Sequence, residues 1–123
     1  MPRVIKRNVE NLSSEDYYKC KSLNYRSRGE MLQVLIHARQ YPKTYPGRAY
    51  LIKDKGDKLL SWALVTQGKV NFYTRKSHRR KGYGKQISQH IAKEYDIENL
   101  EVGMYDERSE AFFAGTKYNK RWR

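Results

Sequence analysis

The segment from Arg75 to Lys85 combines two glycines with six lysine or arginine residues and contains no acidic side chain. Gly82 and Gly84 allow the backbone to turn tightly and to approach a ligand without a Cβ atom in the way. A helix that begins at such a turn directs unpaired N–H groups outward, and these groups favour an anion. The residue types and their spacing therefore predict a binding site for a phosphate-bearing ligand.

Other interpretations of this segment fit less well or stay open. A dinucleotide-binding Rossmann turn needs a third glycine, and that position is Ile87. A P-loop needs a wider glycine spacing and a Ser or Thr after its lysine, whereas Lys85 is followed by Gln86. An exposed basic turn that binds nothing stays open, although a strand expected before the segment and a helix expected after it favour a ligand site.

The positions of Arg79, Gly82 and Gly84 match the pattern Gln/Arg-x-x-Gly-x-Gly/Ala. The segment thus resembles the acetyl-coenzyme A loop of the GNAT superfamily of N-acetyltransferases, and the resemblance in element order covers most of the chain. It implies that acetyl-CoA is the acyl donor, that loop N–H groups hold its pyrophosphate, and that the preceding strand binds its pantetheine arm. The residues that would carry these roles are Phe72, Tyr73 and Thr74 in the strand and Arg79, Arg80, Lys81, Gly82, Tyr83, Gly84 and Lys85 in the loop.

Acetyl transfer requires a neutral amine, a polarised thioester carbonyl and a proton for the leaving thiolate. No metal is needed, and the three histidines lack the spacing of metal ligands. The resemblance implies a tyrosine acid in a Phe-Tyr-x-x-x-Gly-Phe pattern, but the tyrosine position of this run is Phe113. Tyr105, on the neighbouring strand, is the substitute candidate for the acid, and a packed or surface tyrosine is the alternative.

The general base is also displaced from its usual place. Members of the family often carry a glutamate on the strand before the loop, and that strand has no acid here. Glu101, on the next strand, is the candidate, and Asp106 and Glu107 follow it; each could act through a water or simply balance local charge. His78 lies within the loop, where phosphate contact is the expected role.

The elements that would position these residues form an α/β fold with a GNAT-like mixed, mostly antiparallel sheet flanked by helices. A first edge strand is expected near Val4, followed by a helix capped by Ser13 and a second helix that opens at residues 27–30 and ends before Pro42. Strands are expected over 48–53, 58–66, 69–74 and 99–105, helices over 83–95 and 107–116, and a short last strand within 118–123. In the third strand, Leu59 is expected to share a face with Ala63 and Val65.

The strand before the loop and the strand at 99–105 should be parallel neighbours, because a crossover helix joins them. The resemblance implies that these two central strands splay apart and admit the coenzyme. The chain also ends too early for the strand hairpin that usually closes the acceptor site. A second copy of the chain, in a homodimer, could complete this open side, or the side could admit a large substrate.

Bulk composition bounds the remaining possibilities. The chain has 123 residues, which predicts one domain over 1–123, and a formal net charge of +13. No acid occurs from Lys58 to Lys93, which suggests nucleic acid or an acidic protein as a partner, although the coenzyme explains part of the excess. The sequence has no long apolar run and a single cysteine, Cys20, so no membrane partner and a cytoplasmic location are expected.

Two functions follow from these features. The first is an acetyl-CoA-dependent N-acetyltransferase whose acceptor amine is carried by a macromolecule, either a protein or a nucleic-acid-linked amine. The alternative is a GNAT-fold binding module that has lost turnover and uses its basic surface to hold nucleic acid or an acidic protein. Phe113 is the residue that most favours the alternative. Acetylation of small amines is disfavoured by the open acceptor side.

Overall fold

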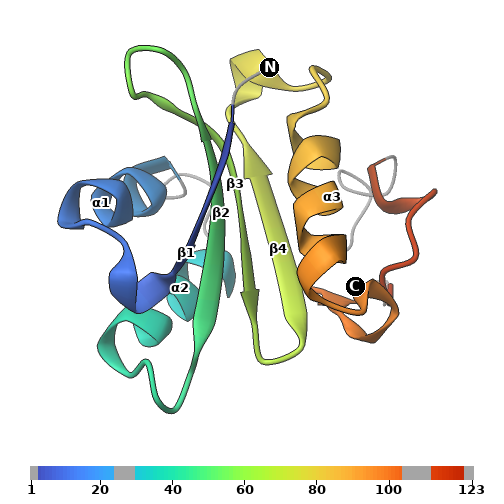
Figure 1. Ribbon diagram of the computed structural model, residues 1–123, viewed down its shortest axis with the longest axis horizontal. Helices are drawn as coiled ribbons and strands as arrows, with labels where there is room; N and C mark the ends of the chain where they lie inside the picture. The colour runs from blue at the N-terminus through green and yellow to red at the C-terminus, as the bar shows by residue number, and fades with distance from the viewer. Residues whose placement is uncertain (1–2, 24–29, 104–111, 121–123) are drawn as a thin grey trace.

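The structure is a computed structural model that describes residues 3–23, 30–103 and 112–120. A five-stranded sheet in the order β1-β2-β3-β4-β5 forms its centre (Figure 1). The strands are β1 (Val4–Asn8), β2 (Gly47–Lys53), β3 (Leu59–Thr66), β4 (Lys69–Thr74) and β5 (Glu101–Val102). The first four pair antiparallel, whereas β4 and β5 pair parallel, so the predicted mixed α/β fold is confirmed.

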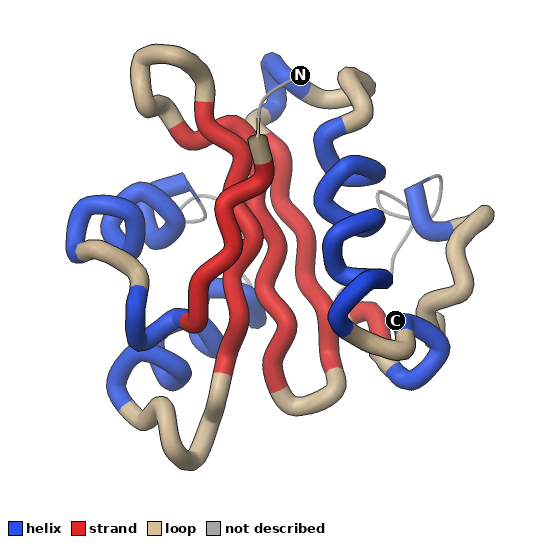
Figure 2. The backbone as a smooth tube through the Cα atoms, in the orientation of Figure 1, coloured by secondary structure: helices blue, strands red, loops and turns tan. Residues whose placement is uncertain are grey.

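Helices cover both faces of this sheet (Figure 2). The helices are α1 (Ser14–Leu23), α2 (Glu30–Gln40) and α3 (Tyr83–Glu94), with short 3-10 turns η1 (Val9–Asn11), η2 (Lys76–His78) and η3 (Ile97–Asn99). The predicted cap of α1 is present, because the Ser13 hydroxyl accepts a hydrogen bond from the Asp16 N–H at 3.0 Å. The cap residues expected at 27–29 lie outside the described residues. Within the described part of the chain, no helix is long and apolar enough to cross a membrane.

The core has two halves, one on each face of the sheet. Ile87 and Ile91 of α3 are fully buried against the face that carries Ala63 and Val65 of β3. Helices α1 and α2 cover the other face, where Trp62 of β3 is fully buried. Burial of each large side chain contributes roughly 1.5–3 kcal/mol, so α3 is held firmly by its predicted apolar stripe. The helix that would present the loop is therefore fixed to the sheet.

One predicted face assignment is wrong. Leu59 packs with Trp62 under α1 and α2 rather than with Ala63 under α3. The register between β2 and β3 shifts at this point, since Ile52 pairs with Ser61 but Lys53 pairs with Leu59. The extra residue of such a β-bulge moves every side chain beyond it to the opposite face.

The pairing of β4 with β5 is short. Lys69 pairs with Glu101 and Val70 with Val102, and the Gly103 N–H donates to Val70 O at 2.8 Å. Within the described residues the ladder ends there, so only the first part of β4 has β5 beside it. The expected strand start at Asn99 is wrong, because Asp96 accepts a hydrogen bond from the Glu98 N–H and caps η3 over that residue.

The C-terminal part of the chain lies along β5. Asn119 forms a parallel bridge with Glu101, and its N–H and C=O bond to Leu100 O and the Val102 N–H at 2.9 Å each. The expected last strand is thus reduced to one bridging residue within the described part of the chain. Most of the helix expected over 107–116 falls outside the described residues.

Candidate functional site

The loop between β4 and α3 has the open helix start that its glycines predict. Gly82 precedes α3 with φ 81° and ψ 9°, a left-handed conformation, and no side chain caps the helix there. The first intrahelical bond at this end runs from the Gln86 N–H to Gly82 O at 2.9 Å. The N–H groups of Tyr83, Gly84 and Lys85 therefore precede the helical ladder and point out of the helix end. A Cβ atom on Gly82 would meet nothing within 4 Å, so the space before the helix is open.

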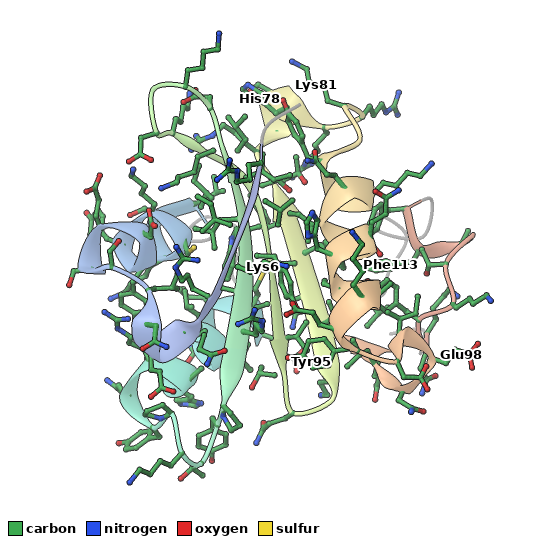
Figure 3. The ribbon with its side chains drawn as sticks, in the orientation of Figure 1. Lys6, His78, Lys81, Tyr95, Glu98 and Phe113 are labelled. Carbon is green, nitrogen blue, oxygen red and sulfur yellow. The ribbon has the colours of Figure 1, made fainter. Side chains whose placement is uncertain are left out.

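The basic side chains of this loop divide into two groups. Arg75 and Arg79 turn inward: the Arg75 Nε donates to Leu59 O and the Arg79 Nε to Thr74 O, each at 3.0 Å. The Arg79 guanidinium also lies 5.6 Å from the centre of the Tyr73 ring. Lys76, Arg80, Lys81 and Lys85 are exposed, and Arg79 is also exposed despite these contacts. The contacts of Arg75 and Arg79 shape the loop, and the other cations add positive charge near the helix start, where Figure 3 shows Lys81.

Strand β4 has a backbone edge that β5 leaves uncovered in the described residues. Backbone groups of alternate residues point to the same side of a strand. Because Val70 O accepts from β5, the N–H and C=O of Phe72 and the N–H of Thr74 also point to that side. The backbone groups of Tyr73 point to β3, opposite Trp62, so of the three predicted strand residues only Phe72 and Thr74 face this edge. Thr74 O is already bonded to Arg79.

An aromatic cluster fills the space between this edge and α3. The ring of Phe72 lies 5.1 Å from that of Phe112 and 5.7 Å from that of Phe113, in edge-to-face contact. A Cβ atom on Gly84 would come within 2.9 Å of the Phe112 ring, so the second glycine allows close approach of this ring. Tyr118 joins the cluster, and its hydroxyl lies 2.7 Å from the Ser88 Oγ of α3. Burial raises the pKa of the Tyr118 hydroxyl.

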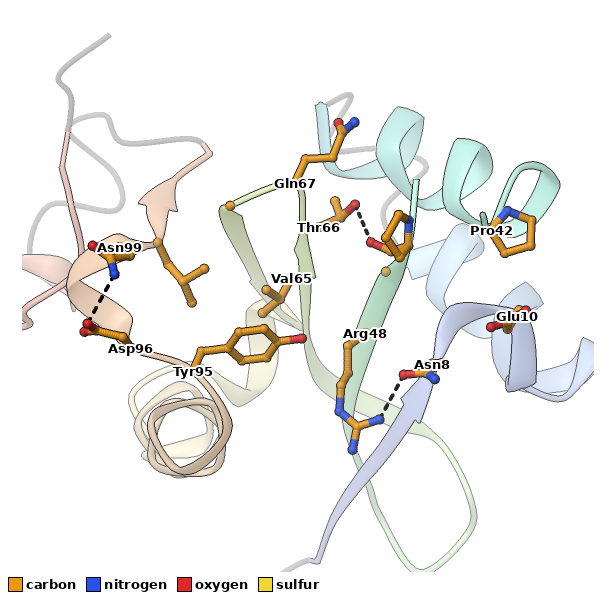
Figure 4. Close-up of a pocket in the computed structure, with 14 residues that line it drawn as sticks. Asn8, Glu10, Pro42, Arg48, Val65, Thr66, Gln67, Tyr95, Asp96 and Asn99 are labelled. Carbon is orange, nitrogen blue, oxygen red and sulfur yellow. Dashed lines mark hydrogen bonds between the residues drawn. The ribbon is translucent and has the colours of Figure 1, made fainter. Parts of the chain in front are cut away.

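A pocket of about 500 Å³ lies at the opposite end of the sheet from the loop (Figure 4). Its wall includes Arg48 and Tyr95, near the C-terminal end of α3. Arg48 pairs with Glu94 at 2.9 Å and lowers the pKa of that carboxyl, and the Tyr50 hydroxyl donates to the same carboxylate at 2.6 Å. None of the predicted site residues lines this pocket. The loop and the pocket are separate features of the surface.

No protein-family model matches the sequence, and no curated protein sequence matches it significantly. Solved structures do match. A protein from Bacillus halodurans superposes with a TM-score of 0.62 at 14% identity, over 89% of each chain. An acetyltransferase from Trypanosoma brucei gives a TM-score of 0.55 at 13% identity, over 97% of this chain and 96% of its own. A ribosomal-protein-alanine N-acetyltransferase from Brucella melitensis gives 0.51 at 14% identity, over 98% of this chain and 81% of its own.

The chain has the GNAT fold. The sequence pattern assigns Phe113 to the position of the tyrosine acid, and the structure buries this residue, 3% exposed, inside the aromatic cluster. The side chain has no proton to donate. Tyr118 contributes a hydroxyl to this cluster. The sequence analysis assigned no role to Tyr118 beyond its place at the end of the same run of residues.

The two predicted catalytic residues have different outcomes in this GNAT fold. Tyr105 lies outside the described residues, as do Asp106 and Glu107. Glu101 is half-buried at the start of β5, beside Lys69. Because the next residue, Val102, is buried under α3, the Glu101 side chain points to the opposite face, toward α2. Glu101 pairs with Lys69, and Phe72 is three residues further along β4. At the rise of a strand, this separates Glu101 from Phe72 by ~10 Å along the sheet.

Asn71 is a polar residue that the sequence analysis missed. It lies on β4, one residue before Phe72, and is only 4% exposed. Its signal was available, since an amide interrupts an otherwise apolar and aromatic strand opposite Leu64. The sequence could not indicate that Oδ1 of this side chain would be buried without a hydrogen-bond partner among the described residues.

Proposed function

We propose that this protein is an acetyl-CoA-dependent N-acetyltransferase whose acceptor amine is carried by a macromolecule, a protein or a nucleic-acid-linked amine. The observation that carries the proposal is the juxtaposition of a glycine-led helix start with an edge of β4, which have no side-chain cap and no neighbouring strand, respectively, among the described residues. The coenzyme carries a diphosphate joined to an arm that contains amides. The diphosphate would bind the helix start and the arm would bind the strand edge, so the two surfaces have to be adjacent. The GNAT fold of the chain supports this use of them.

The loop would hold the diphosphate by its backbone and its exposed cations. N–H groups of Tyr83, Gly84 and Lys85 point out of the helix end, where the helix dipole also favours negative charge. Lys81 and Arg80 are exposed beside them and supply mobile positive charge. Arg79 contributes indirectly, because its bond to Thr74 O ties the loop to the end of β4.

The edge of β4 would bind the pantetheine arm and polarise the thioester. The Phe72 N–H and C=O can pair with an amide of the arm as a neighbouring strand would. The backbone N–H groups on this edge are fixed donors, which suit a carbonyl oxygen that gains negative charge during the reaction. The Phe72 ring and the aromatic cluster behind it exclude water from the same edge.

In the transfer, the amine nitrogen bonds to the thioester carbonyl carbon, and the carbon–sulfur bond breaks. The amine gives up one proton, and the thiolate takes one to leave as a thiol. We assign the first proton to Glu101, acting through water because of its distance along the sheet from Phe72. We assign the second to Tyr105, since Phe113 has no proton to give.

The proposal is tested by calorimetry with acetyl-CoA at low salt, followed by intact-mass measurement of candidate acceptors incubated with the protein and acetyl-CoA. We expect binding and a mass increase of one acetyl group on the acceptor. Absence of acetyl-CoA binding at low salt would overturn the proposal. The buried Phe113 favours a second candidate, a binding module without turnover. Binding of the coenzyme without its consumption, together with salt-sensitive nucleic-acid binding, would support that candidate.

A further inference from the structure

The carboxamide of Asn71 is buried and incompletely satisfied. The residue is 4% exposed, and its Oδ1 has no hydrogen-bond partner among the described residues. Buried polar atoms in folded proteins almost always have a partner, and an orphaned one indicates a water or a ligand. Asn71 thus provides an acceptor that the described part of the fold does not use.

The position of this carboxamide is set by a glycine on β5. A Cβ atom on Gly103 would overlap Asn71 Oδ1 and would come 2.6 Å from Nδ2. Gly103 is also the residue whose N–H makes the last described bond between β5 and β4. The Asn71 side chain therefore lies against the β5 backbone at the point where the described pairing ends. A glycine inside a strand often marks such a close approach.

Asn71 points to the face of the sheet opposite α3. Its neighbours on β4, Val70 and Phe72, pack in the half of the core under α3, so Asn71 faces the other way. Lys69 shares this face and pairs with Glu30 at the start of α2, at 3.2 Å. Glu101 points to the same face, because it pairs with Lys69. The proposed coenzyme site occupies the α3 side, whereas Asn71 lies on the face that α1 and α2 cover, at the point where the described pairing of β4 with β5 ends.

We propose that the Asn71 carboxamide orients the acceptor amine for attack on the thioester. This inference rests on the proposed function and assigns a positioning residue to the acceptor side of that site. Oδ1 accepts one N–H of the amine, which directs the nitrogen lone pair toward a carbonyl held at the edge of β4. Because the carboxamide is neutral, it binds the neutral amine without favouring the ammonium form as a carboxylate would.

The test compares Asn71→Leu and Asn71→Asp with the wild-type chain. The probe acceptors are two hexapeptides, one with a free α-amine and no lysine, the other with a blocked N-terminus and a single lysine. For Asn71→Leu we expect kcat/KM for the acceptor to fall about tenfold or more while the Kd of acetyl-CoA is unchanged. For Asn71→Asp we expect the pH profile of kcat/KM to move to higher pH, because the new carboxylate favours the ammonium form.

Among the described residues, the charged groups on the same face include Lys69, Glu30 and Glu101, and the Lys53–Asp16 pair nearer α1. All of them are kept in both variants, so the shift reports on position 71. Thr66→Val is the matched control, since Thr66 is equally buried at 4% exposure and lies on β3 opposite Lys69, but its hydroxyl already bonds to Pro46 O. We expect this control to lower thermal stability and to leave kcat/KM unchanged.

Gly103→Ala provides a second route if Asn71→Leu folds poorly. The new methyl group collides with the carboxamide, so Gly103→Ala should lose stability and activity together. Adding Asn71→Ala to it removes the collision, and the double variant should regain stability but not activity. Recovery of both would mean that Asn71 only packs.

The outcomes separate this inference from the proposed function. Wild-type kcat/KM in a folded Asn71→Leu variant that binds acetyl-CoA would overturn the role of Asn71 and leave the acetyltransferase proposal standing. A wild-type chain that binds acetyl-CoA but acetylates neither peptide would overturn the role of Asn71 and favour the binding module. A wild-type chain that does not bind acetyl-CoA would overturn the proposed function itself.

Discussion

Gly82 and Gly68 share a left-handed backbone conformation but have different surroundings. Gly82 has φ 81° at the start of α3, and Gly68 has φ 74° in the turn between β3 and β4. A Cβ atom would meet nothing within 4 Å at either position, so a larger residue is opposed by its backbone conformation and not by a collision. The cost of that conformation for a non-glycine residue is ~1–2 kcal/mol.

We expect Gly82→Val to abolish acetyl-CoA binding, because the strained backbone would withdraw the loop N–H groups from the ligand. Gly68→Val should lose comparable stability, by about 1–2 kcal/mol, and retain binding. Urea denaturation gives the stabilities, and calorimetry gives the affinities. Normal acetyl-CoA binding by Gly82→Val would show that the loop has been assigned wrongly.

Arg79 and Arg80 are adjacent cations with different tasks. Both are exposed, but Arg79 bonds to Thr74 O and lies over the Tyr73 ring. We expect Arg79→Met to lower the free energy of unfolding by about 1–2 kcal/mol through the lost hydrogen bond and cation–π contact. Arg80→Met removes the same charge and should change stability by less than about 0.5 kcal/mol, as surface substitutions usually do. Equal losses in the two variants, measured by urea denaturation, would contradict a shaping role for Arg79.

At the scale of elements, α3 is joined to the sheet at its C-terminal end by a carboxylate. Glu94 accepts hydrogen bonds from Arg48 and from the buried Tyr50 of β2. Arg48, and to a lesser extent Tyr50, lower the pKa of the Glu94 carboxyl in the folded state against desolvation. The folded protein then binds fewer protons at this group than the unfolded chain does. Its contribution to stability is present above the unfolded pKa, near ~4.3, and is lost as the pH falls through the folded pKa.

We therefore expect Glu94→Gln to be less stable than the wild-type chain at neutral pH and to approach it at about pH 3. Denaturant titrations at both pH values measure the difference between the two chains. Glu98→Gln is the control, because Glu98 is an exposed carboxylate of η3. Its difference from wild type should stay small at both pH values. A Glu94→Gln deficit of the same size at both pH values would mean that packing, not ionisation, is responsible.

The sequence predicted elements well where periodicity and turn residues agree. The predicted strand over 69–74 has the observed bounds of β4, and the predicted helix over 83–95 is one residue longer than α3. An apolar stripe specifies such a helix locally, through Ile87 and Ile91. The face of Leu59 was mispredicted, because a bulge depends on the pairing of two strands and leaves no local pattern.

The candidate site was predictable only in part for the same reason. Gly82 and Gly84 identify the loop by residue type alone, since few other residues could take their places. The inward use of Arg79 and the orientation of the Tyr73 backbone follow from tertiary contacts and register, which sequence does not reveal. The role proposed for Asn71 also depends on tertiary contacts, because the lack of a partner for its Oδ1 among the described residues is visible only in the folded structure.

At the scale of the whole molecule, the N-terminal end of α3 is basic where helices usually carry acids, whereas its last turn carries both Lys93 and Glu94. Lys81 and Lys85 lie at its N-terminal end with no acid in the first turn, while Glu94 and Glu98 lie at or beyond its C-terminal end. Figure 3 shows Lys81 at one end of the helix and Glu98 at the other. The cations at the N-terminal end interact unfavourably with the helix dipole, which is positive there, whereas Lys93 and Arg48 offset Glu94 at the C-terminal end. A bound anion at the N-terminal end would relieve part of this repulsion.

This arrangement predicts that local charge, and not the net charge of +13, governs coenzyme affinity. Lys81→Glu and Lys43→Glu change the net charge equally. Lys81 is beside the loop, whereas Lys43 is exposed between α2 and β2, next to Pro42 in the wall of the far pocket. At low salt we expect Lys81→Glu to weaken acetyl-CoA binding about tenfold and Lys43→Glu to have little effect, because the second charge is distant.

The difference between the two variants should shrink as salt is added. The Debye length falls from ~30 Å at 0.01 M to ~3 Å at 1 M, so exposed charges near the loop lose their influence. Backbone N–H groups at the α3 start would be in direct contact with the proposed ligand, so their contribution should be screened much less. Calorimetric titrations of both variants across this range measure the two contributions separately. Equal weakening of acetyl-CoA binding by Lys81→Glu and Lys43→Glu at low salt would mean that only the net positive charge of the protein attracts the coenzyme. The diphosphate would then have to bind away from the loop.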